Sequence, residues 1–527
     1  MTERLTSALA NMACALLALS ALGACDRSEM PPLVRSTTLG NVGGGYRKNS
    51  LTVSHDQRRY AWVQTSGDRC RVVADEKKGP LQSICLDPVF SRNGAAVADW
   101  SVPDPGKPPK GYLTVNGTRA DVAFGREAPI AFSREGGSWA TIAPAYDPEG
   151  TPTTPEERGE SAPAGEAPPV PDRPRRLLAL AERGELGEYY DTTTPAVSPH
   201  GEHVAFVAAD AEGNVSLVVD GKVERRFEKP AIRYLPVVKP QKVGPNLEPE
   251  SSVTYLADGS LVTVALAEQG YTVFHDATPW AAYPAVNIPK TGYQVLDPQL
   301  LTLRTLVAGS IVTARDAPVA CWWERPEGKE DRWRVVCNGQ PIDDQLCDNY
   351  WVDQPLAISA DGKSVAYVCP GTPELSPEGI PLGRPPLSIV FGGQRLGPPH
   401  PFVWGVDLSA DGRHYAYAAA DSVDDTFFYV VDGKRYDGPW LGAFPPRLSP
   451  EGTSVVWAAS REEEGKRVDL VVDGDVIARA DVVMAPPLFR GERKVQWAVR
   501  RGKSVHLVTA CTRWAPLPLL RPLVCWW

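Results

Sequence analysis

The sequence has few of the residues from which metal and catalytic sites are most often built. Only seven of its 527 residues are histidine, no two histidines are four positions apart, and no Cys-x-x-Cys pair occurs. Zinc sites commonly depend on such spacings. The Gly-x-Ser-x-Gly turn that carries the nucleophile of α/β-hydrolases is also absent. We therefore expect no catalytic residues, no metal site and no cofactor.

Basic charge and long apolar stretches are also scarce. The chain has 55 Lys and Arg against 64 Asp and Glu, a net charge of -9. Nucleic-acid-binding surfaces need clustered Lys and Arg, so we expect no nucleic acid partner. Beyond residue 24, no run is apolar enough to span a bilayer as a helix.

The first 24 residues have the features of an export signal. Arg4 precedes an apolar stretch from Leu5 to Ala24, which is typical of a secretory leader. The leader ends in Leu22-Gly23-Ala24-Cys25, which resembles the lipobox of bacterial lipoproteins. The resemblance implies cleavage before Cys25 and acylation of its thiol. The residues predict an envelope protein, lipid-anchored at a periplasmic face or the cell surface, and leave open which membrane holds it.

Eight cysteines follow Cys25, and an even number in an exported chain indicates disulfides. They form four sequence-neighbour pairs separated by about 14 to 22 residues, which suits bonds between adjacent antiparallel strands; closing a loop of about 15 residues contributes roughly 3 kcal/mol. The predicted pairs are Cys70–Cys85, Cys321–Cys337, Cys347–Cys369 and Cys511–Cys525.

One pattern recurs from residue 50 onward: Ser, any residue, an acidic residue or Asn, Gly, and then an alternating strand with an aromatic residue. Its clearest copies begin at Ser198, Ser359, Ser409 and Ser449, and weaker copies begin at Ser54, Ser91 and Ser133 and near Leu256, Arg315 and Phe489. Most copies are followed by a second strand that ends in Asp-Gly or Asn-Gly, the residues of a tight hairpin turn. The pattern predicts about ten units of antiparallel strands.

The units resemble the WD-like repeats of the TolB-type β-propeller family. The resemblance covers nearly all of residues 50 to 510 and implies an all-β propeller with four-stranded antiparallel blades. It also implies structural roles for the turn residues Asp361, Asp411 and Gly452. Ten units exceed the usual ring of six to eight blades, so one large ring and two rings both remain open.

Two segments interrupt the repeats. Residues 31 to 45 end in three glycines and favour a flexible tether, whereas residues 146 to 176 are rich in Pro and Glu and favour disorder. The stretch from Arg175 to Arg183 predicts a short helix. We therefore divide the chain into a signal peptide (1–24), a lipidated N-terminus and tether (25–49), first blades (50–145), an insertion with a short helix (146–190) and remaining blades (191–527).

Tryptophans near loops suggest a binding surface. Four of them are candidate interface residues because Trp often dominates protein interfaces: Trp322, Trp323, Trp404 and Trp440. The sequence thus predicts a non-catalytic, membrane-anchored propeller that binds a protein or an envelope polymer. The alternative is an enzyme or small-ligand receptor, for example one acting on glycans, that uses the propeller channel.

Overall fold

We analysed a computed structural model of the chain. It describes residues 33–511 except 48–49, 92, 103–109, 124–129, 135–136, 145–176, 190, 211–213, 228–251, 268–269, 285–310, 325, 327–331, 349–354, 374–376, 378–384, 423–425, 463–466 and 493. Regular structure in these residues consists of strands, which form ten antiparallel sheets. No helix among the described residues is long and apolar enough to cross a membrane.

We number the sheets as blades in chain order. Blade 1 contains β2 (Thr52–Val53), β3 (Tyr60–Ser66), β4 (Arg69–Ala74) and β5 (Lys77–Lys78). Blade 2 contains β6 (Ile84–Cys85), β7 (Val89–Phe90), β8 (Val97–Val102), β9 (Lys110–Val115) and β10 (Thr118–Ala123). Blade 3 contains β11 (Ile130–Phe132), β12 (Trp139–Pro144), β13 (Leu177–Ala181) and β14 (Gly184–Tyr189). Blade 4 contains β15 (Asp191–Thr192), β16 (Ala196–Val197), β17 (Val204–Ala209), β18 (Val215–Val219) and β19 (Lys222–Phe227).

The next three blades follow the same order. Blade 5 contains β20 (Ser252–Tyr255), β21 (Leu261–Ala267), β22 (Gly270–His275) and β23 (Thr278–Pro284). Blade 6 contains β24 (Val312–Thr313), β25 (Ala320–Glu324), β26 (Arg332–Cys337), β27 (Gln340–Pro341) and β28 (Cys347–Asp348). Blade 7 contains β29 (Leu356–Ile358), β30 (Val365–Pro370), β31 (Leu387–Phe391) and β32 (Gln394–His400).

The last three blades bring the chain back to its beginning. Blade 8 contains β33 (Phe402–Leu408), β34 (Tyr415–Ala420), β35 (Phe427–Val431) and β36 (Lys434–Trp440). Blade 9 contains β37 (Gly442–Ala443), β38 (Arg447–Leu448), β39 (Val455–Ser460), β40 (Val468–Val472) and β41 (Asp475–Ala480). Blade 10 contains β42 (Val482–Val483), β43 (Leu488–Phe489), β44 (Lys494–Arg501), β45 (Ser504–Cys511) and the N-terminal β1 (Leu33–Asn41).

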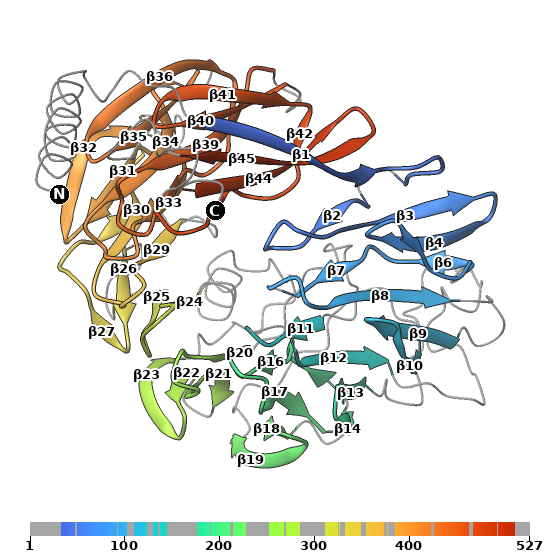
Figure 1. The fold of residues 1–527 in the computed structure, drawn as a ribbon. Helices are drawn as coiled ribbons and strands as arrows, with labels where there is room; N and C mark the ends of the chain where they lie inside the picture. Colours follow the sequence, from blue (N-terminus) through green and yellow to red (C-terminus); the bar gives the residue numbers. More distant parts are fainter. Residues whose placement is uncertain are drawn as a thin grey trace, which may run out of the picture.

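The ten blades follow one another around a single ring (Figure 1). The first strands of neighbouring blades contact each other, for example β16 with β20, β24 with β29 and β29 with β33, so they form the inner side of the ring. The fourth strands, such as β19, β23 and β32, lie on its outer side (Figure 1). The all-β propeller with four-stranded blades is therefore confirmed, and the described residues form one ring rather than two.

The hydrophobic core lies between the blades. One buried cluster joins blades 8 and 9 through Tyr429, Trp440 and Trp457, whose side chains are at most 3% exposed. Other clusters join blade 5 to blade 6 and blade 10 to blade 1. Because neighbouring blades cover both faces of a sheet, second strands such as β30 and β39 are buried along their whole length.

The N-terminal segment closes the ring, which corrects the prediction of a tether over residues 31 to 45. Strand β1 pairs with β45, with Leu33 opposite Cys511 and Asn41 opposite Ser504. It takes the fourth position of blade 10, outside three strands from the C-terminal part of the chain. The segment is mostly exposed because it covers the outer edge of a sheet, and local composition does not reveal a partner more than 460 residues away.

The predicted helix from Arg175 to Arg183 and the boundary of the insertion at residue 190 are wrong. Residues 177 to 181 form β13, which pairs with β12 on one side and with β14 on the other. Residues 177 to 189 thus form the third and fourth strands of blade 3. Their pairing within the sheet stabilises the extended conformation more than local propensity favours a helix. The Pro- and Glu-rich residues 146 to 176 lie outside the described residues.

Three of the four predicted disulfides are present. Cys321–Cys337 lies within blade 6, Cys70–Cys85 joins blade 1 to blade 2, and Cys347–Cys369 joins blade 6 to blade 7. The fourth pair includes Cys525, which lies outside the described residues. Two of the three bonds therefore cross between blades, where they restrain the ring in addition to its apolar core.

Candidate functional site

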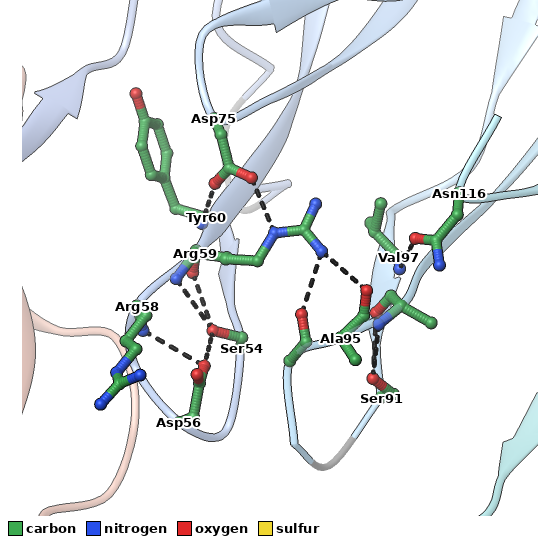
Figure 2. Close-up of polar contacts among 12 residues, drawn as sticks. Ser54, Asp56, Arg58, Arg59, Tyr60, Asp75, Ser91, Ala95, Val97 and Asn116 are labelled. Atoms are coloured by element: carbon green, nitrogen blue, oxygen red, sulfur yellow. Dashed lines mark hydrogen bonds and ion pairs between the residues drawn. The ribbon is translucent and has the colours of Figure 1, made fainter. Parts of the chain in front are cut away.

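The serine of the repeated turn organises the connection between the first two strands of a blade. In blade 1, the Ser54 hydroxyl donates to Asp56 Oδ1 at 2.5 Å and accepts a hydrogen bond from the Arg59 amide at 3.0 Å (Figure 2). The same two bonds recur in blades 7 and 8. In blade 7, the hydroxyl of Ser359 is the largest cause that lowers the pKa of Asp361 to about 2. These carboxylates are engaged in holding the turn.

The Asp or Asn of the second turn links the third strand of the blade to the second. Asp75 Oδ1 accepts a hydrogen bond from the Tyr60 amide at 3.1 Å, and Asn116 Oδ1 accepts one from Val97 at 3.0 Å (Figure 2). Equivalent bonds occur in blades 4, 5, 6, 8 and 9. The Asp and Asn residues have φ near +50°, which these short polar residues tolerate better than most. Both kinds of turn lie at one end of the blades, which we call the turn face; the opposite end is the loop face.

Neighbouring turns on the turn face are joined by backbone hydrogen bonds. The Asp316 amide donates to Ala360 O at 2.8 Å, and the Ala360 amide donates to Ala410 O at 3.0 Å. The Ala410 amide then donates to Pro450 O at 2.7 Å. Blades 6, 7, 8 and 9 are thereby linked in series at this face.

Side chains continue this series around the ring. The Glu451 amide of blade 9 donates to Glu492 of blade 10 at 2.7 Å, and Arg490 of blade 10 donates to Asp56 O of blade 1 at 2.6 Å. Arg59 then donates to two carbonyl oxygens in the turn of blade 2 (Figure 2). The polar groups of this face are thus largely used to build the ring.

One contact passes over two blades. Arg134 in the turn of blade 3 donates to Arg315 O in the turn of blade 6 at 2.6 Å, and it lies 3.4 Å from Asp316 Oδ1. The turns of blades 4 and 5 are therefore bypassed. This contact links blades 3 and 6 directly at the turn face.

The lengths of the connections distinguish the two faces. On the turn face, the connections between the first and second strands contain four to six residues, and those between the third and fourth strands contain two. The stretches of sequence that join strand ends at the loop face reach 16 residues between β30 and β31, 24 between β19 and β20, 27 between β23 and β24, and 32 between β12 and β13. Because long loops on a rigid scaffold often carry binding residues, the loop face is the candidate functional surface.

Three of the four predicted interface tryptophans are in the core. Trp322 and Trp323 are fully buried in blade 6, and Trp440 is 3% exposed between blades 8 and 9. Their prediction as surface residues is wrong, because wedge-shaped gaps between blades take bulky side chains. Trp404 differs from them, since 55% of it is exposed.

A β-bulge follows Trp404 in β33. The register between β33 and β34 shifts between Trp404 and Val406, and Gly405 within this shift has φ +77°. Val403 and Val406 are both buried in the core between blades 7 and 8. Because successive side chains of a strand point to opposite faces, Trp404 points away from that core, and the bulge after it returns Val406 to the core side.

Two further exposed apolar residues lie in the neighbouring blade. Leu441 and Phe444, which flank β37, are 43% and 37% exposed. The backbone at Gly405 approaches Pro445 so closely that a Cβ at Gly405 would lie 2.7 Å from the proline ring. We call Trp404, Leu441 and Phe444 the Trp404 patch. It lies on the loop-face side of blades 8 and 9, at the start of their first strands.

The histidines do not converge on a common centre among the described residues. His203 and His414 contact Asp220 and Asp432 of their own blades, both at 2.7 Å. His400 ends β32 in the gap between blades 7 and 8, where burial lowers its pKa. The described part of the chain contains no group of three or more His, Cys, Asp or Glu side chains placed to hold a metal.

Comparison with known proteins assigns no family. No family model and no curated protein matches the chain. The solved structures that resemble it include one described as a eukaryotic initiation factor, with TM-score 0.38 and 9% identity over 86% of this chain and 98% of that chain. Two others are described as propellers.

One of these is the β-propeller domain of the Trilobed protease from Pyrococcus furiosus, with TM-score 0.28 and 11% identity over 67% of this chain and 96% of that one. The other is the Dos1 propeller, with TM-score 0.29 and 10% identity over 72% of this chain and 92% of that one. Because these TM-scores are low, the fold assignment rests on the sheets and contacts of this chain.

Proposed function

We propose that this chain is an exported lipoprotein, acylated at Cys25, whose TolB-type propeller binds a partner protein through its loop face and catalyses no reaction. The lipobox-like sequence from Leu22 to Cys25 supports the anchor. Two or more acyl chains at about 0.8 kcal/mol per buried methylene would hold the protein on a membrane.

The exposure of Trp404 is the observation that carries the binding role. A tryptophan that is 55% exposed on an inner strand retains a large apolar surface in contact with water. Its backbone is fixed on both sides by the pairing of β33 with β34 and by the contact of Gly405 with Pro445. Because this backbone is already ordered in the sheet, binding there costs less conformational entropy than binding at a mobile position. Trp is also enriched among the residues that dominate interfaces.

The test is affinity capture from native membranes with the full-length lipidated protein as bait. Trp404→Ala should weaken capture of the partner by about 30-fold, which corresponds to the roughly 2 kcal/mol typical of a central interface residue. Val223→Ala is the matched control, because Val223 is 52% exposed and lies near the turn face. It should leave capture unchanged.

The outcomes separate the possible ligands. A single stoichiometric protein that is lost with Trp404→Ala supports the proposal. Capture of an envelope polymer instead would replace the protein partner by a glycan or another polymer on the same surface. Equal capture by both variants would show that the Trp404 patch is not the binding surface.

A further inference from the structure

We infer that the turn face is the surface that the lipid anchor holds against the bilayer, so that the loop face points away from the membrane. The inference rests on the proposed acylation of Cys25. It assigns a lipid surface to one face of the ring and leaves the opposite face, with the Trp404 patch, free for a macromolecular partner.

The direction of β1 determines where the anchor enters the propeller. Leu33 lies opposite Cys511 in β45, and Cys511 lies opposite Lys494 at the start of β44. Lys494 follows the turn between the first and second strands of blade 10, at residues 490 to 493. The chain therefore enters blade 10 at the turn face, whereas Asn41 at the other end of β1 lies at the loop face.

The segment from Cys25 to Leu33, which we call the tether from here on, reaches no further than the height of a blade. From Cys25 to Leu33 the chain advances eight residues, which span at most about 28 Å when fully extended. Strand β1 has nine residues and is about 30 Å long. If the bilayer lay against the loop face, the tether would have to run fully extended along the side of blade 10 to reach it. The turn face can meet the bilayer with the same tether relaxed.

The turn face is also built to lie close to a flat surface. Its connections contain no more than six residues in any blade, and every longer stretch of sequence between strands joins strand ends at the loop face. Its turns are tied to one another by hydrogen bonds such as those from Asp316 to Ala360 and from Ala410 to Pro450. Approach to lipid headgroups therefore requires neither the displacement of a loop nor the opening of a turn.

Two positions at opposite ends of one strand provide the test. Arg413 and Ser422 flank β34, Arg413 at the turn face and Ser422 at the loop face, and both are exposed. A fluorophore is attached through a genetically encoded azide at either position of the full-length lipidated protein, which is reconstituted into phosphatidylcholine vesicles that contain a quencher-labelled lipid. Because β34 separates the probes by about 20 Å, quenching at 413 should exceed quenching at 422 by about twofold or more.

Two controls distinguish this inference from the proposed anchor. Cys25→Ser should abolish vesicle binding, and mass analysis of the N-terminal peptide should show acylation only in the parent protein; failure of either result contradicts the anchor itself. A Gly-Ser insertion of about 20 residues after Arg27 should reduce the difference between the probes, because it frees the tether. Acylated, vesicle-bound protein with equal quenching at both positions, or stronger quenching at 422, would overturn the inferred orientation while leaving the anchor in place.

Discussion

Replacement of Trp440 tests the packing between blades 8 and 9. Its side chain is 3% exposed, and its ring centroid lies 5.5 Å from that of Tyr429 and 5.8 Å from that of Trp457. Tyr429 also donates a hydrogen bond to the carbonyl oxygen of Phe444 at 3.1 Å. Trp440 therefore packs against a side chain that is bonded to the segment crossing from blade 8 to blade 9. Trp440→Ala would leave a cavity in this gap.

The expected cost of that cavity is large. Replacement of a buried Phe or Trp by Ala lowers the free energy of unfolding by about 3–5 kcal/mol. Trp404→Ala is the matched variant in the same blade. Because Trp404 is 55% exposed, its replacement should change the free energy by less than about 1 kcal/mol.

Thermal unfolding of the oxidised protein, followed by near-ultraviolet circular dichroism, measures both changes. Trp440→Ala should lower Tm by several degrees, and Trp404→Ala should leave Tm almost unchanged. Trp440→Phe, which refills part of the gap, should give an intermediate Tm and covers the case in which the alanine variant does not fold. Equal values of Tm for Trp440→Ala and Trp404→Ala would refute the assignment of one tryptophan to the core and the other to the surface.

Two further changes test the turns and a partly buried carboxyl. Gly452→Ala would place a Cβ 2.2 Å from the His414 ring at φ +72°, whereas a Cβ at Gly491 meets no atom of the described residues within 4 Å at φ +71°. Only the first variant should therefore lower Tm beyond the cost of backbone strain. Burial raises the pKa of Asp99 from 3.8 to about 6. The folded protein then binds this proton more tightly than the unfolded chain, so the free energy of unfolding should fall as pH rises from about 4 to 6. Asp99→Asn should accordingly raise Tm at pH 7.5 but not at pH 4; equal effects at both pH values would contradict this explanation.

The blade architecture is predictable from sequence because it is encoded in local turns. Each of the ten repeats forms its own sheet. Seven of them have a serine at the first turn and five have Asp-Gly or Asn-Gly at the second, and such turns specify hairpins within about 30 residues. Cys70–Cys85 is predictable for a similar reason, because strands adjacent in sequence are adjacent in the ring. Local patterns do not specify how many blades a ring contains.

The features that sequence did not predict depend on distant contacts. The pairing of Leu33 with Cys511 joins the two ends of the described chain. The sequence of neither strand indicates which strand it pairs with. Trp404 lies on the surface as predicted, whereas neighbouring blades cover tryptophans elsewhere in the ring. The same residue type at Trp440 is buried, so composition alone does not distinguish a core tryptophan from a surface one.

Photo-crosslinking in intact cells tests the central claim most directly. A photoreactive amino acid is placed at Leu441 or Ser422 on the loop face, and at Lys363 or Arg413 on the turn face, in the full-length lipidated protein. The account predicts one protein adduct of constant mass from the loop-face positions, lost with Trp404→Ala, and lipid adducts from the turn-face positions. Protein adducts from the turn face alone, or loop-face adducts unaffected by Trp404→Ala, would contradict it.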